Sequence, residues 1–206
     1  MDDWGTQILR KGSVFSCVKR YGTDFNAACR RQEREDRKMW GKIKPEELHE
    51  NPFSLIGEDW MLVAASDGSR VNAMTASWGG MGILWNKKVA FVFIRPQRYT
   101  KELIDQSGKL SLSFFDEGSR KMLNYMGTVS GRDEDKIAAC GLHVEMVNSA
   151  PVFQESRMAI ICRKLYAQPM EEACFLDQEL IAKNYPDRDY HTVYVVEIEK
   201  ILVQKQ

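Results

Sequence analysis

The segment Val89–Thr100 has the sequence VAFVFIRPQRYT and predicts a strand that passes directly into a helix. Residues 89–94 are apolar at every position, which indicates a strand covered on both faces. Pro96 ends this strand, and Thr100 is placed to cap a helix over 101–106. The segment therefore predicts a buried strand that delivers two arginines and a hydroxyl group to the start of a helix.

Further strand patterns occur on both sides of this segment, mostly in hairpin order. Residues 60–65 are apolar, and Asp67-Gly68 joins them to 71–76, because favoured hairpin turns need positive φ. Residues 110–115 begin with alternating leucine and serine, which predicts a half-buried strand. The other predicted elements are strands over 157–166 and 191–203 and short helices over 119–126, 134–140 and 173–182.

These patterns give about six strands and roughly four or five short helices. A regular alternation of strand and helix with a GxGxxG fingerprint is absent, so a Rossmann sheet is not expected. We predict a mainly β fold, an antiparallel barrel with peripheral helices. A chain of 206 residues suits one such domain.

Residues 1–38 differ from the rest of the chain in charge and lack a sustained apolar period. They hold nine basic and six acidic residues, which leaves 20 and 23 beyond them, since the chain has 29 of each. We expect a basic extension, disordered or a solvated helix, followed by the main domain over 39–206. A basic arm that docks on a partner, and a natural start at Met39, are the alternatives.

The composition narrows the classes of function. A formal net charge of zero argues against nucleic acid as the main partner, because a phosphate backbone requires a basic excess. No apolar run suits a membrane span, and no secretory signal pattern is present. Five cysteines without a CxxC pair indicate free thiols in the cytoplasm. His49, His143 and His191 lie far apart without ligand-spaced partners, so no metal site is expected.

Three polar segments contain the candidate binding residues. Arg95 and Arg98 offer forked donors beside a helix start, which suits a phosphate, while solvated or acid-paired arginines are the alternative. Polar groups in 72–78 can bond the edge of a heterocycle on which Trp78 stacks, but a hairpin arm with a core tryptophan gives the same pattern. Residues 130–132 suit either an anion nest or a plain helix cap.

His191 is the candidate catalytic residue. It begins the last predicted strand, where it can face a pocket and donate a hydrogen bond or a proton to a substrate. The GxSxG elbow, the Walker loop and the HExxH helix are all absent. The sequence thus offers a binding constellation without an acid–base pair.

Four motifs occur together in one order: NAMTASWGG over 72–80, RPQRYT over 95–100, LSLSFF over 110–115 and GTVSGRDEDK over 127–136. Together they resemble the flavin reductase-like proteins of the flavoredoxin type, over about residues 44–203. The resemblance implies an FMN-binding split β-barrel that forms a homodimer, with flavin near the subunit interface. One departure is Val196, where the closing strand of the family commonly has a glycine.

The resemblance also implies roles for individual residues. The NAMTASW residues would line the isoalloxazine and ribityl region, and residues 95–100 would hold the ribityl and phosphate groups. Residues of the 127–136 loop would complete the pocket, and His191 would lie on the nicotinamide or substrate side. The implied cofactor-binding residues are Asn72, Met74, Thr75, Ser77, Trp78, Arg95, Gln97, Arg98, Tyr99, Thr100, Ser130, Gly131 and Lys136.

We therefore predict a cytoplasmic oxidoreductase that binds FMN, with FAD or riboflavin as alternative flavins, and passes electrons from NAD(P)H to an acceptor. No side-chain nucleophile is required, because the flavin performs hydride chemistry at its own ring. One alternative is a flavoredoxin-like carrier that keeps FMN bound and serves a redox protein partner. The other is a non-catalytic flavin-binding module.

Overall fold

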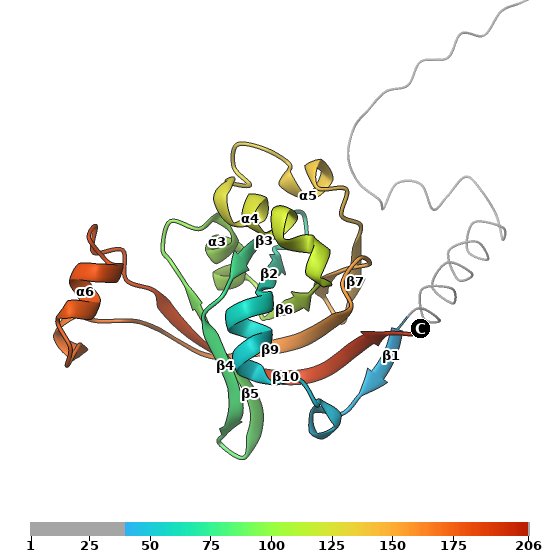
Figure 1. The fold of residues 1–206 in the computed structure, drawn as a ribbon, viewed down its shortest axis with the longest axis horizontal. Helices are drawn as coiled ribbons and strands as arrows, with labels where there is room; N and C mark the ends of the chain where they lie inside the picture. Colours follow the sequence, from blue (N-terminus) through green and yellow to red (C-terminus); the bar gives the residue numbers. More distant parts are fainter. Residues whose placement is uncertain (1–39, 206) are drawn as a thin grey trace, which may run out of the picture. The chain divides into compact units, whose positions relative to one another are not determined.

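The computed structural model describes residues 40–205, which form a mainly β fold with short helices around one large sheet (Figure 1). The mainly β class predicted from the sequence is therefore confirmed. The expected extension over 1–38 and the alternative start at Met39 lie outside the described residues. Within residues 40–205, no helix is long and apolar enough to cross a membrane.

Eight of the described strands form one antiparallel sheet, and two shorter strands form a separate hairpin. The order in the large sheet is β3–β2–β6–β9–β10–β5–β4, with β1 paired to β10. The strands are β1 (Trp40–Ile43), β2 (Met61–Ser66), β3 (Val71–Ala76), β4 (Gly79–Leu84), β5 (Lys87–Ile94), β6 (Lys109–Phe114), β7 (Val144–Val147), β8 (Ala150–Phe153), β9 (Met158–Pro169) and β10 (Thr192–Gln204). The helical segments are η1 (Pro45–Glu47), α2 (Pro52–Ser54), η2 (Leu55–Asp59), α3 (Tyr99–Gln106), η3 (Glu117–Ser119), α4 (Arg120–Thr128), α5 (Lys136–Ala139), η4 (Glu172–Cys174) and α6 (Glu179–Asn184).

Strand β10 pairs with three other strands of the large sheet. It pairs with β9 along most of its length, with β5 through residues 192–197 and with β1 through 201–204. Its register with β9 shifts between Val195 and Val196, and such irregularities bend a strand. Val196, the residue that departs from the family pattern, is fully buried in the main core.

Strand β6 is buried on both faces, so the prediction of a half-buried strand is wrong. Ser111 and Ser113 are as inaccessible as their apolar neighbours because the β7–β8 hairpin lies over them. Ser111 Oγ donates a hydrogen bond to the carbonyl oxygen of Pro151 in β8. This hairpin was not predicted, although its turn at Asn148–Ser149 has the positive φ values that a tight hairpin turn requires.

The two faces of strand β5 are covered unequally by the described residues. Ala90, Val92 and Ile94 belong to the main core. Phe91 and Phe93 point to the opposite face and are only half-buried. Val89, which shares this face, is fully buried, so the predicted cover on both faces is complete on the core face and partial on the other.

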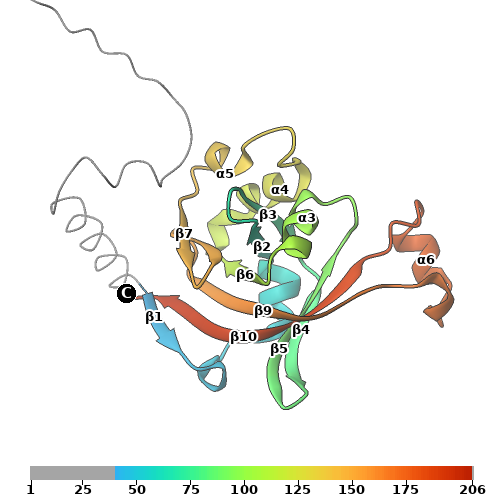
Figure 2. The same ribbon diagram turned by 180° about the vertical axis from the view of Figure 1, so that it is seen from behind.

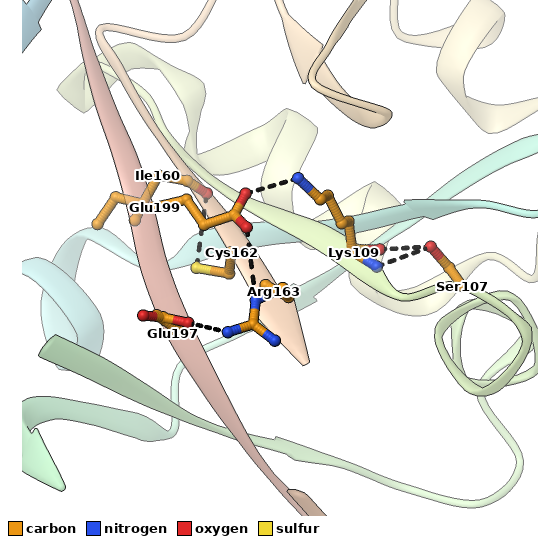
Figure 3. Close-up of polar contacts among 7 residues, drawn as sticks. All are labelled: Ser107, Lys109, Ile160, Cys162, Arg163, Glu197 and Glu199. Atoms are coloured by element: carbon orange, nitrogen blue, oxygen red, sulfur yellow. Dashed lines mark hydrogen bonds and ion pairs between the residues drawn. The ribbon is translucent and has the colours of Figure 1, made fainter. Parts of the chain in front are cut away.

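A ladder of charged side chains crosses this same outer face of the sheet further along the strands. Figure 3 shows Glu199 of β10 paired with both Arg163 of the neighbouring β9 and Lys109 of β6, the next strand beyond. Arg163 also pairs with Glu197, which Lys87 of β5 reaches at 2.7 Å. Each such exposed pair contributes little to stability by itself, but the ladder leaves this part of the face charged.

The connection between β9 and β10, residues 170–191, extends away from the sheet (Figures 1 and 2). Figures 1 and 2 both show its helix α6 at a distance from α3, α4 and α5. The predicted single helix over 173–182 is wrong, because η4 and α6 are two short segments. Phe175, Tyr185 and Tyr190 pack together with ring centroids 5.1 to 5.7 Å apart, so the 170–191 connection has a small aromatic core.

Candidate functional site

A cavity of about 200 Å³ lies where β3 ends, β5 ends and β10 begins. Because β10 pairs with β5 in antiparallel fashion, the start of β10 lies beside the end of β5, and His191 is brought next to Arg95. Three segments that are distant in the sequence therefore meet at one place. The lining residues are Met74, Thr75, Ala76, Ser77, Trp78, Phe93, Arg95, Arg98 and His191.

Four further predicted site residues line a second hollow of about 420 Å³. Asn72, two residues before Met74 on β3, lines it together with Tyr99, Gly131 and Lys136. Most of the predicted site residues are thus divided between two hollows that share the strand β3, whereas Gln97, Thr100 and Ser130 line neither.

Asn72 joins β3 to the start of α3 and to the loop before α5. Its Nδ2 donates to Thr100 Oγ1 at 2.8 Å, and both side chains are buried. Thr100 lies within the first turn, and the capping residue of α3 is Arg98, so the predicted Thr100 cap is wrong. At Gly131 the backbone passes so close that a Cβ atom would lie 2.1 Å from Asn72 Oδ1.

Arg98 and Lys136 hold the carboxyl end of α4 through backbone carbonyl groups. Arg98 Nη1 donates to the oxygen of Gly127 at 2.5 Å, and Lys136 Nζ donates to those of Met126 and Val129 at 2.7 and 2.9 Å. Lys136 is almost completely buried. Within residues 40–205, neither cation forms an ion pair with a carboxylate.

The environment of these two cations opposes their charge. Burial, followed by the charge of Arg98, lowers the pKa of the Lys136 ammonium to about 8. Burial also lowers the pKa of the Arg98 guanidinium, with a contribution from Arg95. A buried cation that has only carbonyl partners and no carboxylate is costly, so this end of the site favours an added anion.

Arg95 is engaged in a different way. Its Nη1 forms an ion pair with Asp189, and its Nη2 donates to the carbonyl oxygen of Asn184 at 2.8 Å. Gln97 Nε2 donates to the same Asp189 oxygen at 2.7 Å. The guanidinium also lies over the ring of Tyr185, 5.2 Å from its centroid. Sequence analysis missed Asp189, since no local pattern indicates a carboxylate that meets Arg95 across a long connection.

The hydroxyl groups of Thr75 in β3 and Ser77 in the turn after it differ in whether they can still donate a hydrogen bond to a ligand. Thr75 Oγ1 donates to the carbonyl oxygen of Leu123 in α4, so only its lone pairs remain for a ligand. Ser77 lines the cavity, and no described residue forms a hydrogen bond with its hydroxyl group. Trp78 is 46% exposed and lies 5.1 Å from the His191 ring, so the alternative of a core tryptophan is wrong.

His191 is a buried neutral imidazole. Its Nδ1 lies 2.9 Å from the hydroxyl oxygen of Tyr185, whose other neighbour, Met170 Sδ, is a weaker acceptor at 3.8 Å. The hydroxyl group therefore donates to Nδ1, and the proton of the ring resides on Nε2. Burial, with the charge of Arg95 next in size, lowers the pKa of His191 to about 4. Proton donation from an imidazolium is thus disfavoured at neutral pH, but hydrogen bonding from Nε2 is available.

The other predicted residues lie further from the cavity. Ser130 Oγ accepts from the backbone nitrogen of Arg132 at 3.2 Å. Arg70 and Arg132 both lie over the ring of Tyr99, at 5.7 and 5.0 Å from its centroid. Among the described residues, no cluster of three or more potential metal ligands occurs.

Fold and site together have the features of a flavin-binding split β-barrel, and comparison with known proteins bears on this directly. The family model described as "Flavin reductase like domain" matches residues 53–206, and the chain belongs to this family. The family and the split-barrel fold that the sequence motifs indicate are thereby confirmed.

Similar solved structures include two flavoredoxins. That of Methanosarcina acetivorans is 22% identical with a TM-score of 0.58, over 72% of this chain and 69% of the other. That of Desulfovibrio vulgaris (Miyazaki F) is 26% identical with a TM-score of 0.55, over 70% and 68%. Among curated proteins, the uncharacterized protein YddH of Escherichia coli (strain K12) is 29% identical over 133 residues, 62% of this chain and 70% of YddH.

We expect His191 to titrate near pH 4 in the folded protein, because burial and Arg95 disfavour the imidazolium. An unfolded histidine titrates near 6.5, so the unfolded state binds more protons between these values. The contribution of His191 to stability should therefore be lost as pH falls from about 6.5 to about 4. NMR titration of the ring protons, assigned with His191→Gln, measures this, and a midpoint above 6 would contradict it.

Proposed function

We propose that this protein is a cytoplasmic FMN-dependent oxidoreductase that passes electrons from NAD(P)H through flavin to an acceptor. The observation that supports this most directly is the pair of buried cations Arg98 and Lys136, which lack a carboxylate partner among the described residues. A phosphate group supplies the missing negative charge, and forked guanidinium donors suit it. The family membership makes a flavin the natural bearer of that phosphate.

The residues present fit such a ligand along the length of β3. Arg98, with donors left over, and Lys136, with one N–H left over, would neutralise the phosphate at the carboxyl end of α4. Ser77 would bond the polar edge of the ring, and Trp78 would cover part of its face. Tyr99, Thr100, Ser130 and Gly131 would support the phosphate end around Asn72.

When bound, FMN would supply the hydride and electron chemistry, and the protein would supply binding, orientation and electrostatics. The neutral His191 would offer its Nε2 proton as a hydrogen bond to the second substrate without adding charge. The cavity walls formed by Phe93 and Met74 would limit the access of water. No described side chain has to act as a nucleophile in this scheme.

One alternative has an observation in its favour. The similarity to two flavoredoxins supports a carrier that keeps FMN bound and exchanges electrons with a redox protein. The 46% exposed Trp78 at the edge of the cavity is compatible with electron transfer to such a partner. A flavin-binding module without turnover is the remaining alternative.

Purified protein should bind FMN, because Arg98 and Lys136 suit its phosphate and Ser77 and Trp78 suit its planar ring. With FMN bound, it should oxidise NAD(P)H. The measurement is flavin absorbance after mixing and desalting, followed by nicotinamide oxidation with and without free FMN. Turnover that occurs only with a redox protein would replace the reductase with the carrier. Absence of flavin uptake under all conditions would contradict the whole proposal.

Arg98→Ala should weaken FMN more than riboflavin by about 1.5–3 kcal/mol, the size of a charge-assisted contact. Arg95→Ala should discriminate less between the two flavins, because Asp189 already compensates Arg95. Arg163→Ala is a control, since this exposed arginine pairs with Glu197 and lines neither hollow. Titration of each variant with both flavins measures the difference. An equal loss for FMN and riboflavin in Arg98→Ala would show that Arg98 does not bind the phosphate.

We also propose that the protein is a homodimer. On the outer face of the sheet, Phe91 and Phe93 of β5 lie beside Val195 and Val193 of β10, and the 43% exposed Tyr166 of β9 pairs with Val195. The described residues cover this apolar area only in part: Trp85 packs against Tyr166, and Phe175 lines a hollow with Val193. The adjacent part of the face is charged. A second copy of the chain could cover this area with its own apolar area, as in a symmetric dimer.

Light scattering should accordingly give the mass of two chains. Phe91→Lys should shift the protein towards one chain, because a charge at the centre of an apolar interface is costly to bury. Phe53→Lys is the matched control, since Phe53 is 85% exposed elsewhere on the molecule. A single-chain mass for the unmodified protein at micromolar concentration would contradict the homodimer.

A further inference from the structure

One carboxylate of the 170–191 connection, that of Asp189, contacts the cavity residue Arg95 directly. Asp189 receives both Arg95 and Gln97 from the end of β5. Arg95 reaches the same connection a second time through the carbonyl oxygen of Asn184 and lies over Tyr185. Asp189 is therefore the negatively charged partner of the arginine that lines the cavity next to His191.

The two ends of the proposed flavin site consequently differ in net charge. At the α4 end, Arg98 and Lys136 have no carboxylate partner among the described residues. At the β10 end, Arg95 and Asp189 compensate each other. Burial raises the pKa of the Asp189 carboxyl group, but the hydrogen bonds from Arg95 and Gln97 outweigh it and the net shift is downward, so Asp189 is ionised at neutral pH. The neighbouring His191 adds no charge there.

We propose that Asp189 determines substrate specificity at the β10 end of the cavity: by compensating Arg95, it restricts this end to a ring without an anionic group. This inference rests on the proposed function, in which flavin fills the remainder of the site. The ligand class is an uncharged planar ring with an amide or carbonyl oxygen, which accepts from His191 Nε2 and contacts Trp78. A carboxylate on that ring would compete with Asp189 for Arg95 and would lie close to its negative charge.

A purely structural role for Asp189 makes a different prediction. If the Arg95–Asp189 pair only fastens the 170–191 connection, its loss would weaken every ligand of this end to the same extent. If the pair sets the local charge, its loss would favour anionic ligands over neutral ones of equal shape. The comparison of two matched rings separates these cases.

The test uses FMN-loaded protein with benzamide and benzoate as probes, their binding measured by ligand-observed NMR. In the unmodified protein, benzamide should bind more tightly than benzoate. Asp189→Asn frees Arg95 for the carboxylate, so benzoate affinity should rise by about tenfold while benzamide affinity stays within about twofold. Asp189→Glu, which retains the charge, should keep the original preference. Asp187→Asn is the matched control, because Asp187 is an exposed acid in the same connection.

The double variant Arg95→Gln/Asp189→Asn removes both charges and should return benzoate to its original weak binding. An unchanged preference in Asp189→Asn, equal losses for both probes, or an equal gain in Asp187→Asn would each overturn the inference. FMN uptake is recorded separately by absorbance. Protein that takes up no FMN contradicts the proposed function and this inference together, whereas FMN-loaded protein with an unchanged preference contradicts this inference alone.

Discussion

The antiparallel pairing of β10 with β5 is the constraint on which the rest of the structure depends. It runs from Thr192 opposite Ile94 to Glu197 opposite Val89. The other edge of β10 pairs with β9 along almost its whole length, and β1 pairs with its last residues. This pairing places the residue before β10, His191, beside the residue after β5, Arg95. Without it, the cavity would lose one wall, and the 170–191 connection would have no fixed starting point.

The site that results is organised by charge compensation. Arg95 and Arg98 lie three residues apart and have the same side chain, but their charges are compensated differently. Arg95 forms an ion pair with Asp189, whereas Arg98 donates to a backbone carbonyl group. A buried cation gains from any anion that reaches it, whereas a paired cation gains little. One short turn can therefore serve as a binding site at one residue and as a structural attachment at the other.

The sequence was informative wherever a local pattern determines the outcome. The hairpin through Asp67-Gly68, the strand over 89–94 and the family motifs all follow from residues close together in the chain. The failures were non-local. The serines of β6 look half-exposed until the β7–β8 hairpin covers them, and Thr100 suits a helix cap until Asn72 binds it from β3. Asp189 could not be found in this way, because its partner Arg95 lies 94 positions earlier in the chain.

The contact of Gly131 with Asn72 has a consequence for how this sequence can change over time. A Cβ atom at position 131 would overlap the Asn72 amide, so any larger residue there requires a smaller one at position 72. The two positions belong to different motifs of the chain and are expected to co-vary among relatives. Gly131 would then be retained or lost together with Asn72, which lies 59 positions earlier in the chain, because of their packing and not only because of a shared ligand.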